Sequence, residues 1–244
     1  MQEISLEKLL ETGAYFGHQT RRWNPKMEDY VYDVRDGVHI FDLIKTKQAI
    51  AQALEVLKKA STEGKTILFV GPKKQSKDKL TEVAKATGYP YVNQRWLGGT
   101  LTNFGQIRSS VEQLGKLKND LESGAFADYT KKERLLIERR VQKLEKFVGG
   151  LVTLKSMPDL MVVVDTHRER GAIIEATRLR IPVVGIVDTN SDPGEVEYPI
   201  PMNDDATAAI SYVLELMQGA IGEGKSTKPK KEKKVTKGAK KAKK

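Results

Sequence analysis

The chain has 244 residues, of which 39% are hydrophobic, and a formal net charge of +10. This length and composition suit one sizeable α/β domain plus an appendage, which excludes a protein that is disordered as a whole. Cysteine is absent, which excludes disulfides, thiol catalysis and cysteine-ligated zinc and is compatible with a reducing cytoplasm. No apolar run approaches the roughly 18 residues of a membrane helix, so we expect no membrane partner.

The first informative segment is residues 12–27, which contain no Asp or Glu. Arginine can hold a phosphate with its planar fork, tryptophan offers a stacking face, and asparagine can reach ribose hydroxyls or base edges. The segment is therefore predicted to contact RNA. Its candidate residues are His18, Gln19, Arg21, Arg22, Trp23, Asn24 and Lys26.

The next elements alternate between helix and strand. Residues 46–63 form an amphipathic helix pattern closed by Gly64, and residues 66–70 read as a buried strand. A basic run follows at the start of the next helix, where backbone N–H groups favour phosphate. It lacks the spacing of a nucleotide P-loop. Its candidate residues are Lys73, Lys74 and Lys77, and Ser76 is expected to cap a helix that ends at Gly88.

After a short strand at residues 89–92 comes the sequence NQRWLGGTLTNF, residues 93–104, within a second window without carboxylates that spans residues 83–111. Both tryptophans of the chain thus lie beside Arg and Asn where no acid is near. A glycine turn with a core tryptophan is the alternative interpretation of the motif. The predicted RNA-binding residues here are Arg95, Trp96, Thr100, Thr102, Asn103 and Arg108, and the two tryptophans either stack on bases or pack behind the contact loops.

Residues 104–156 have a different period. Apolar residues recur at intervals of four and three along two stretches, with Lys118 in place of one expected apolar residue. Thr130 and Glu133 form a capping-box pattern that starts the second stretch. Two heptad helices in one chain predict an antiparallel helical hairpin, an arm of about 30 Å, and a dimerising coiled coil is the alternative.

Two further apolar strands are expected at residues 160–164 and 182–187, with helices at about 168–180 and 204–218. Fully apolar strands indicate helices on both faces of a parallel sheet. Right-handed crossovers then favour an α/β fold, a three-layer, doubly wound and mainly parallel sheet of about five strands, flavodoxin-like in arrangement.

An enzyme is the rival function. Asp165, Asp188, Asp204 and Asp205, with His18 or His167 nearby, could hold Mg²⁺ where open α/β sheets bind ligands. The simpler interpretation is that the Asp side chains cap helices and close turns. No pairing of a nucleophile with a base is identifiable and no GxGxxG occurs, so we predict no catalysis and no cofactor. No metal ligands are assigned, and a structural cation at Asp188, Asp204 and Asp205 stays open.

Charge is distributed unevenly. Residues 225–244 contain eleven Lys and one Glu, which accounts for the net charge of +10 and leaves the rest neutral. This segment is predicted to be disordered, and a DNA compactor acting through it is a second rival. Residues 181–224 have no Lys or Arg, so we expect them to face away from phosphates and the protein to dock by one side only.

Three motifs together resemble the bacterial ribosomal protein S2 family: FGHQTRRWNPKM at residues 16–27, the NQRWLGGTLTNF segment, and IPVVGIVDTNSDP at 181–193 followed by IPMNDDA at 200–206. The match runs in order from about Leu9 to Gly222. The chain departs from the family at Met202, where a small residue is usual, and in its lysine-rich tail, about which the resemblance implies nothing.

The resemblance implies a non-catalytic component of the small (30S) ribosomal subunit that binds 16S rRNA and helps to hold ribosomal protein S1. It also implies a cytoplasmic, ribosome-bound protein, and we do not expect a homo-oligomer. The predicted organisation is an α/β RNA-binding domain of residues 1–103 and 157–224, an inserted arm of residues 104–156, and the tail of residues 225–244.

Overall fold

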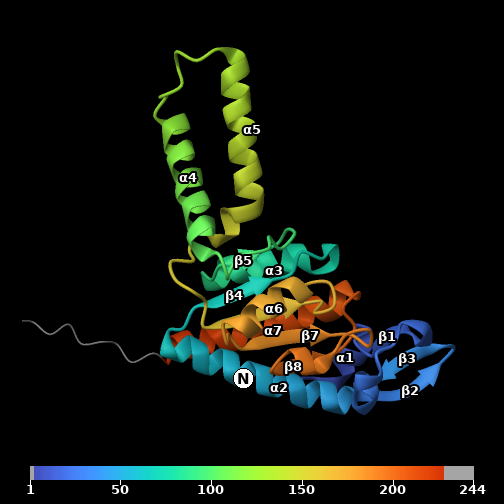
Figure 1. The fold of residues 1–244 in the computed structure, drawn as a ribbon. Coiled ribbons are helices and arrows are strands. Elements are labelled where there is room, and N and C mark those ends of the chain that lie inside the picture. Colours follow the sequence, from blue (N-terminus) through green and yellow to red (C-terminus); the bar gives the residue numbers. More distant parts are fainter. Residues whose placement is uncertain (1–2, 228–244) are drawn as a thin grey trace, which may run out of the picture.

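The computed structural model describes residues 3–227, and its centre is a five-stranded parallel sheet (Figure 1). The strands are β4 (Ile67–Val70), β5 (Tyr91–Val92), β6 (Leu160–Val164), β7 (Val183–Val187) and β8 (Tyr198–Pro201), in the order β5-β4-β6-β7-β8. This is the flavodoxin-like order, in which the direction of winding reverses between β4 and β6, the first and third strands of the sheet along the chain. The predicted doubly wound α/β fold is confirmed.

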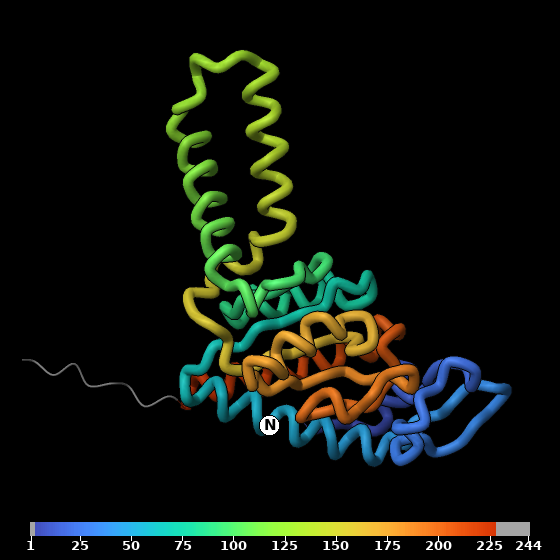
Figure 2. Tube along the Cα trace, viewed as in Figure 1, coloured from blue at the N-terminus to red at the C-terminus, as the bar shows by residue number. Residues whose placement is uncertain are grey.

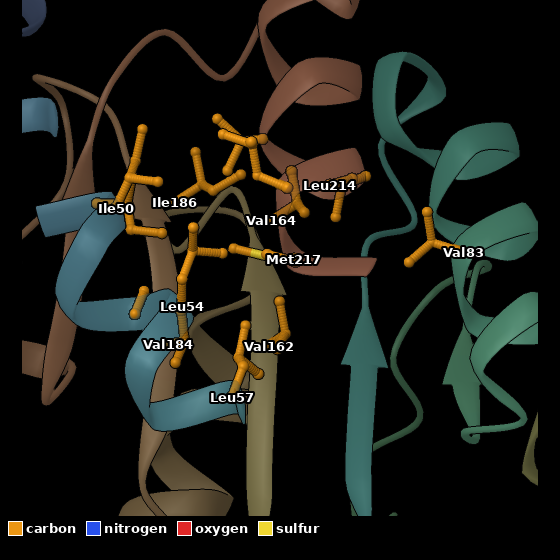
Figure 3. Packing of buried hydrophobic residues seen from close by; sticks show 14 of the residues in the cluster. Ile50, Leu54, Leu57, Val83, Val162, Val164, Val184, Ile186, Leu214 and Met217 are labelled. Carbon is orange, nitrogen blue, oxygen red and sulfur yellow. The ribbon is translucent and has the colours of Figure 1, made fainter. Parts of the chain in front are cut away.

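One face of the sheet is covered by α2 (Leu43–Glu63), α3 (Lys74–Thr87) and α7 (Thr207–Ser226), with the short α1 (Leu6–Glu11) beside them. Side chains at alternate strand positions, such as Val162 and Val164, point into this layer, as the two-residue period of a strand requires. Figure 3 shows Leu54 of α2 and Met217 of α7 meeting these valines.

The opposite face is covered by α6 (Arg170–Arg178) together with irregular chain. Met161 and Val163 point to this side and pack with Trp96 and Leu101, which come from the segment between β5 and the arm. Helices therefore lie on both faces as predicted, but much of the second layer is a loop. That loop contains the strongest RNA-binding motif of the sequence.

The arm consists of α4 (Phe104–Glu122) and α5 (Lys131–Val148), antiparallel and joined by a short link at the tip (Figure 2). Leu114, Val141 and Val148 form its buried seam. Thr130 and Glu133 make the predicted capping box: the Thr130 backbone N–H donates to Glu133 Oε2 at 2.9 Å, and the Glu133 N–H donates to Thr130 Oγ1 at 3.4 Å. Lys118, the polar position in the heptad ladder, forms an ion pair with Glu145 of the facing helix.

Residues 16–41 form a second sheet that the sequence analysis did not predict. Its strands β1 (Phe16–Gln19), β2 (Val31–Arg35) and β3 (Val38–Phe41) are antiparallel in the order β1-β3-β2. Asp36 and Gly37 join β2 to β3 with φ values of 50° and 74°, the left-handed geometry that favours an Asp-Gly hairpin turn. The small sheet lies beyond the ends of β7 and β8, away from the arm (Figure 1).

Several helix boundaries differ from those expected. Helix α2 begins at Leu43 because Asp42 caps it, and α7 runs from Thr207 to Ser226 rather than over 204–218. Ser76 does not cap α3: its hydroxyl donates to the carbonyls of Gly71 and Lys73, while Lys73 occupies the cap position. Over residues 3–227, no helix has both the length and the apolarity needed to span a bilayer. The disordered tail was predicted to begin at residue 225, but α7 continues to Ser226, and the rest of that prediction, from residue 228 on, lies outside the described part.

The arm meets the sheet edge at Gly150, in the 3₁₀ turn Gly149–Leu151 that follows α5. A Cβ at this position would collide with the backbone oxygen of Tyr91 and would lie 2.8 Å from its ring. We expect Gly150→Ala to lower the free energy of unfolding by about 1–3 kcal/mol, the usual cost of overpacking, as measured by urea denaturation.

Gly115→Ala on α4 is the matched control, because a Cβ there meets nothing within 4 Å. Alanine is the better helix former, so this variant should gain up to about 1 kcal/mol. Equal urea midpoints for Gly150→Ala and the unmodified chain would show that the junction is not tightly packed.

Candidate nucleic-acid interface

The motif at residues 93–103, hereafter the contact loop, is held by one carboxylate. Glu175 Oε1 accepts hydrogen bonds from the Trp96 indole N–H at 3.0 Å and the Gly99 N–H at 2.8 Å. Its other oxygen accepts from the Leu101 and Thr102 N–H groups and from the Thr102 hydroxyl, each at 3.0 Å. Five donors from the loop thus converge on a side chain of α6.

Glu175 is buried, with only 7% of its surface exposed. Burial raises the pKa of its carboxyl group, but the hydrogen bonds from Thr102, Trp96, Gly99 and Leu101 outweigh this effect and hold the pKa below its ordinary value. The loop is therefore organised around an anion. The sequence analysis missed Glu175, although a glutamate between Ala172, Ile173 and Ala176 on the apolar side of a helix was an available signal.

The contact loop divides its predicted RNA-binding residues between interior and surface. Arg95, Thr102 and Asn103 are exposed. Trp96 is 8% exposed and packs in the core, so it lies behind the loop rather than on a stacking surface. Thr100 is 2% exposed and its hydroxyl donates to the Leu97 carbonyl at 2.6 Å, so its side chain is used inside the loop rather than presented at the surface.

The second candidate segment, residues 18–26, folds into two 3₁₀ turns, Thr20–Arg22 and Pro25–Tyr30. Asn24 fixes their junction, because its N–H donates to the Thr189 carbonyl at 2.8 Å and its side chain accepts from the Lys26 N–H at 3.1 Å. Trp23 is partly buried and packs against the His39 ring, with centroids 5.0 Å apart. Of the predicted RNA-binding residues in this segment, those left exposed are Gln19, Arg21, Arg22 and Lys26.

The acidic segment of residues 181–224 does not face away from this basic segment, and that expectation is wrong. Asp188 Oδ1 lies 2.9 Å from His18 Nδ1, and Asp192 Oδ2 lies 2.5 Å from Lys26 Nζ. The two segments lie together because opposite charges pair at the carboxyl ends of β7 and β8. Asp192 therefore partly neutralises the ammonium group of Lys26, which is not so for the guanidinium groups of Arg21 and Arg22.

Lys73 is the clearest correction to the predicted site. It is 8% exposed, and its Nζ lies 2.7 Å from Asp204 Oδ1, 2.7 Å from Asp205 Oδ1 and 3.2 Å from Asp165 Oδ2. Burial lowers the pKa of the ammonium, but the carboxylates outweigh it and raise the pKa above its ordinary value. Lys73 therefore neutralises the acidic cluster inside the protein, and only Lys74 and the partly exposed Lys77 remain for an external phosphate.

The acidic cluster also contains the atoms best placed to hold a cation. Ligand atoms of His18, Asp188 and Asp204 lie within 4.8 Å of one another. Burial and the Asp188 and Asp165 carboxylates raise the pKa of Asp204 to about 8, and its Oδ2 has no hydrogen-bond partner within residues 3–227. The hydrogen bond to Asp188 raises the pKa of His18, although burial opposes it. His167, the other histidine considered for a magnesium site, is exposed.

The sheet order separates the predicted RNA-binding residues into two groups. Residues 18–26 lie near β7 and β8, whereas the contact loop and Arg108 follow β5 at the other edge. Four intervals of about 4.8 Å between strands place roughly 19 Å between these edges. The structure thus brings the residues together in two patches, with Lys74 after β4 between them.

Glu175→Gln tests whether the carboxylate holds the contact loop. An amide retains one acceptor oxygen and turns an NH₂ group toward N–H donors, so we expect a loss of about 2–3 kcal/mol in the free energy of unfolding at pH 7. Because the folded pKa of Glu175 is lowered, its contribution is present above the ordinary carboxyl pKa of about 4.3 and is lost as pH falls through the folded value.

Urea denaturation at pH 7 and at stepwise lower pH measures the difference in free energy of unfolding between the unmodified chain and the Glu175→Gln variant. This difference should become smaller below about pH 4. The control is Glu112→Gln, whose partner Arg108 is exposed, so the change should cost at most about 1 kcal/mol. A Glu175→Gln variant as stable as this control would mean that the five hydrogen bonds do not secure the loop.

Comparison with known proteins now gives the family. A sequence profile described as "Ribosomal protein S2" matches residues 9–224. The chain is 45% identical to "Small ribosomal subunit protein uS2c" of Cyanophora paradoxa over 93% of this chain and 98% of the relative. It is 48% identical to "Small ribosomal subunit protein uS2" of Campylobacter concisus (strain 13826) over 91% and 85% of the two chains.

A third relative, "Small ribosomal subunit protein uS2" of Rippkaea orientalis (strain PCC 8801 / RF-1), is 46% identical over 92% of this chain and 84% of the relative. Together these matches confirm the predicted resemblance, and they identify a structural component of the small ribosomal subunit rather than an enzyme. The chain belongs to the ribosomal protein S2 family.

Proposed function

We propose that this ribosomal protein binds 16S rRNA through two patches at opposite edges of its sheet, one formed by residues 18–26 and the other by the contact loop. Through these patches it helps to build the small subunit in the cytoplasm. The observation that carries the proposal is the anchoring of the contact loop by Glu175. A loop with its backbone fixed from within presents Arg95, Thr102 and Asn103 outward at little further cost in conformational entropy.

The side chains of the two patches suit RNA. Arg21, Arg22 and Arg95 are exposed, and within residues 3–227 none of them has a carboxylate within ion-pair distance. Their guanidinium groups are free to bind phosphate with two parallel hydrogen bonds or to stack on a base. Thr102 and Asn103 add groups that can bond ribose hydroxyls or base edges.

Reversing one charge in each patch, with Arg21→Glu and Arg95→Glu together, should abolish incorporation into small subunits and leave the protein folded. Incorporation is measured by sedimentation of the tagged protein in cell extract with and without RNase, and folding by circular dichroism. The phosphate contribution is lost in both patches, and each new carboxylate repels the backbone.

Lys59→Glu together with Arg178→Glu makes the same change of charge at exposed positions of α2 and α6, outside residues 18–26 and 93–103. This control should incorporate normally. If the Arg21 and Arg95 variant incorporates as well as the control does, neither patch is an RNA contact.

A different surface suits a protein partner, and we propose that it supports ribosomal protein S1. A groove of about 860 Å³ runs between α1, the small sheet and the start of α2. Leu10 is 57% exposed, Tyr32 is 73% exposed and Ile44 is 62% exposed along it. The charged lining residues are Glu7, Asp36, Asp42 and Arg35, mostly acidic, so the groove repels RNA and favours an apolar segment with basic flanks.

Leu10→Asp should weaken the retention of S1 on subunits that contain the variant, while incorporation of the variant itself is unchanged. The reason is that a carboxylate within the apolar groove must be desolvated when a partner segment binds. Ile174→Asp, on an exposed apolar position of α6, is the control. The retention of S1 is measured by quantitative immunoblotting of purified subunits. If the Leu10→Asp subunits retain as much S1 as the Ile174→Asp subunits do, the groove is not the site that supports S1.

A further inference from the structure

The hairpin turn at Asp36-Gly37 carries a chemistry that neither RNA binding nor the groove uses. It is the single Asp-Gly pair of the chain, and no Asn-Gly pair occurs. In such a pair the backbone nitrogen of the glycine can close a five-membered ring with the carboxyl carbon of the aspartate. Glycine has no side chain to shield that nitrogen. The turn is therefore a candidate for isomerisation of the main chain.

Both reacting groups are uncommitted in the structure. Asp36 and Gly37 are exposed. Over residues 3–227 the Asp36 carboxylate has no hydrogen bond and no ion pair, whereas the nearby Asp33 carboxylate accepts from Arg35. In the same part of the chain the Gly37 N–H donates no hydrogen bond, and a Cβ at Gly37 would meet nothing within 4 Å. No packed atom therefore hinders the approach of the nitrogen to the carboxyl carbon.

The pair Asn190-Ser191, whose asparagine can close the same ring, shows the opposite situation. Ser191 is 2% exposed, and its N–H donates to the Asp188 carbonyl at 3.0 Å. The side-chain oxygen of Asn190 accepts from the Ser191 hydroxyl at 3.1 Å. A buried nitrogen with a bonded proton, next to a side chain held in place, closes the ring only after local unfolding. The fold thus protects one reactive pair and exposes the other.

We propose that Asp36-Gly37 is a site of isoaspartate formation. The Gly37 nitrogen attacks the carboxyl carbon of Asp36, a C–N bond forms, and one water leaves, made of the carboxyl OH and the amide proton. Water then adds to one of the two carbonyls of this cyclic imide and breaks its bond to the nitrogen. Addition at the side-chain carbonyl restores aspartate. Addition at the main-chain carbonyl gives isoaspartate, whose main chain runs through the former side chain, and no other reactant is consumed.

The isomer does not fit the turn that it forms in. One carbon is added to the main chain between Arg35 and Val38, which face each other as partners in the β2–β3 ladder, and a two-residue hairpin turn has no room for it. The Gly37 carbonyl accepts from the Thr20 N–H at 2.9 Å, and Thr20 begins the first 3₁₀ turn of the patch at residues 18–26. Isomerisation therefore displaces an acceptor that fixes this patch. This consequence for assembly rests on the proposed function, whereas the modification itself does not.

The first test counts isoaspartate with a methyltransferase that esterifies the α-carboxylate of isoaspartate, with S-adenosylmethionine as the methyl donor, and leaves aspartate unmodified. The full-length protein is kept folded at neutral pH, and samples taken over time are digested and labelled. Methyl acceptance should rise with time in the unmodified protein and be lost in Asp36→Ser. Asp36→Asn, which closes the ring by losing ammonia more readily, should accept methyl groups sooner than either.

Circular dichroism confirms that the variants are folded, and peptide mapping of the labelled digests should place the methyl ester at residue 36. Three results would overturn the proposal: no rise in the unmodified protein while Asp36→Asn is labelled, equal rises in the unmodified protein and Asp36→Ser, or a label that maps to Asn190.

The second test asks whether the isomer disturbs the patch at residues 18–26. The aged, unmodified protein is mixed with small-subunit rRNA and the other subunit proteins, and the assembled subunits are separated from free protein by sedimentation. Isoaspartate at residue 36 should be depleted in the subunit fraction relative to the free fraction of the same sample. An equal share in both fractions would overturn the link to the patch and leave the modification site standing. Failure of the fresh, unmodified protein to assemble would instead overturn the proposed function.

Discussion

The buried carboxylate of Glu175 is the interaction on which the rest of the surface depends. Residues 93–103 have almost no regular backbone hydrogen bonding of their own, yet they cover part of the second face of the sheet and lead directly into α4. Five donors on one anion replace the ladder that a strand or helix would provide. The same bonds thus fix a core tryptophan, the exposed arginine beside it and the start of the arm.

Charge pairing organises the carboxyl ends of the strands in a similar way. Parallel strands bring Asp165, Asp188 and Asp204 together at the carboxyl ends of the sheet. The mutual repulsion of these buried carboxylates would be unfavourable if no cation were near. Lys73 and His18 supply the opposite charge from two distant parts of the chain. In many folds of this kind the edge binds a ligand. Here the charged groups at the carboxyl ends pair with one another and hold separate segments of the chain together, which agrees with a structural rather than a catalytic family.

The sequence predicted the elements whose signals are local. Strands β4, β6 and β7 are continuous apolar runs, the arm has a heptad period, and the Thr130 capping box spans four residues, so each could be recognised without tertiary knowledge. Strand β8, with two prolines in four residues, has no such pattern and was not predicted. Lys73 could not be assigned from sequence, because an exposed and a buried lysine differ only in what the fold brings near. The small sheet was missed although Asp36-Gly37 is a hairpin signal, since its strands are short and only two of their residues, both in β3, are buried.

The junction at Gly150 gives the arm a mechanical property. Helix α4 leaves the body where Glu175 clamps the contact loop, and α5 returns where Gly150 abuts Tyr91 of the edge strand β5, so both ends of the lever are seated on the same rim. Helix α5 is about 27 Å long at 1.5 Å per residue, and a tilt of roughly 5° at its base would displace the tip by about 2 Å. A force applied at the tip would therefore act on β5. The close packing of Gly150 against Tyr91 holds the arm at one angle to the body.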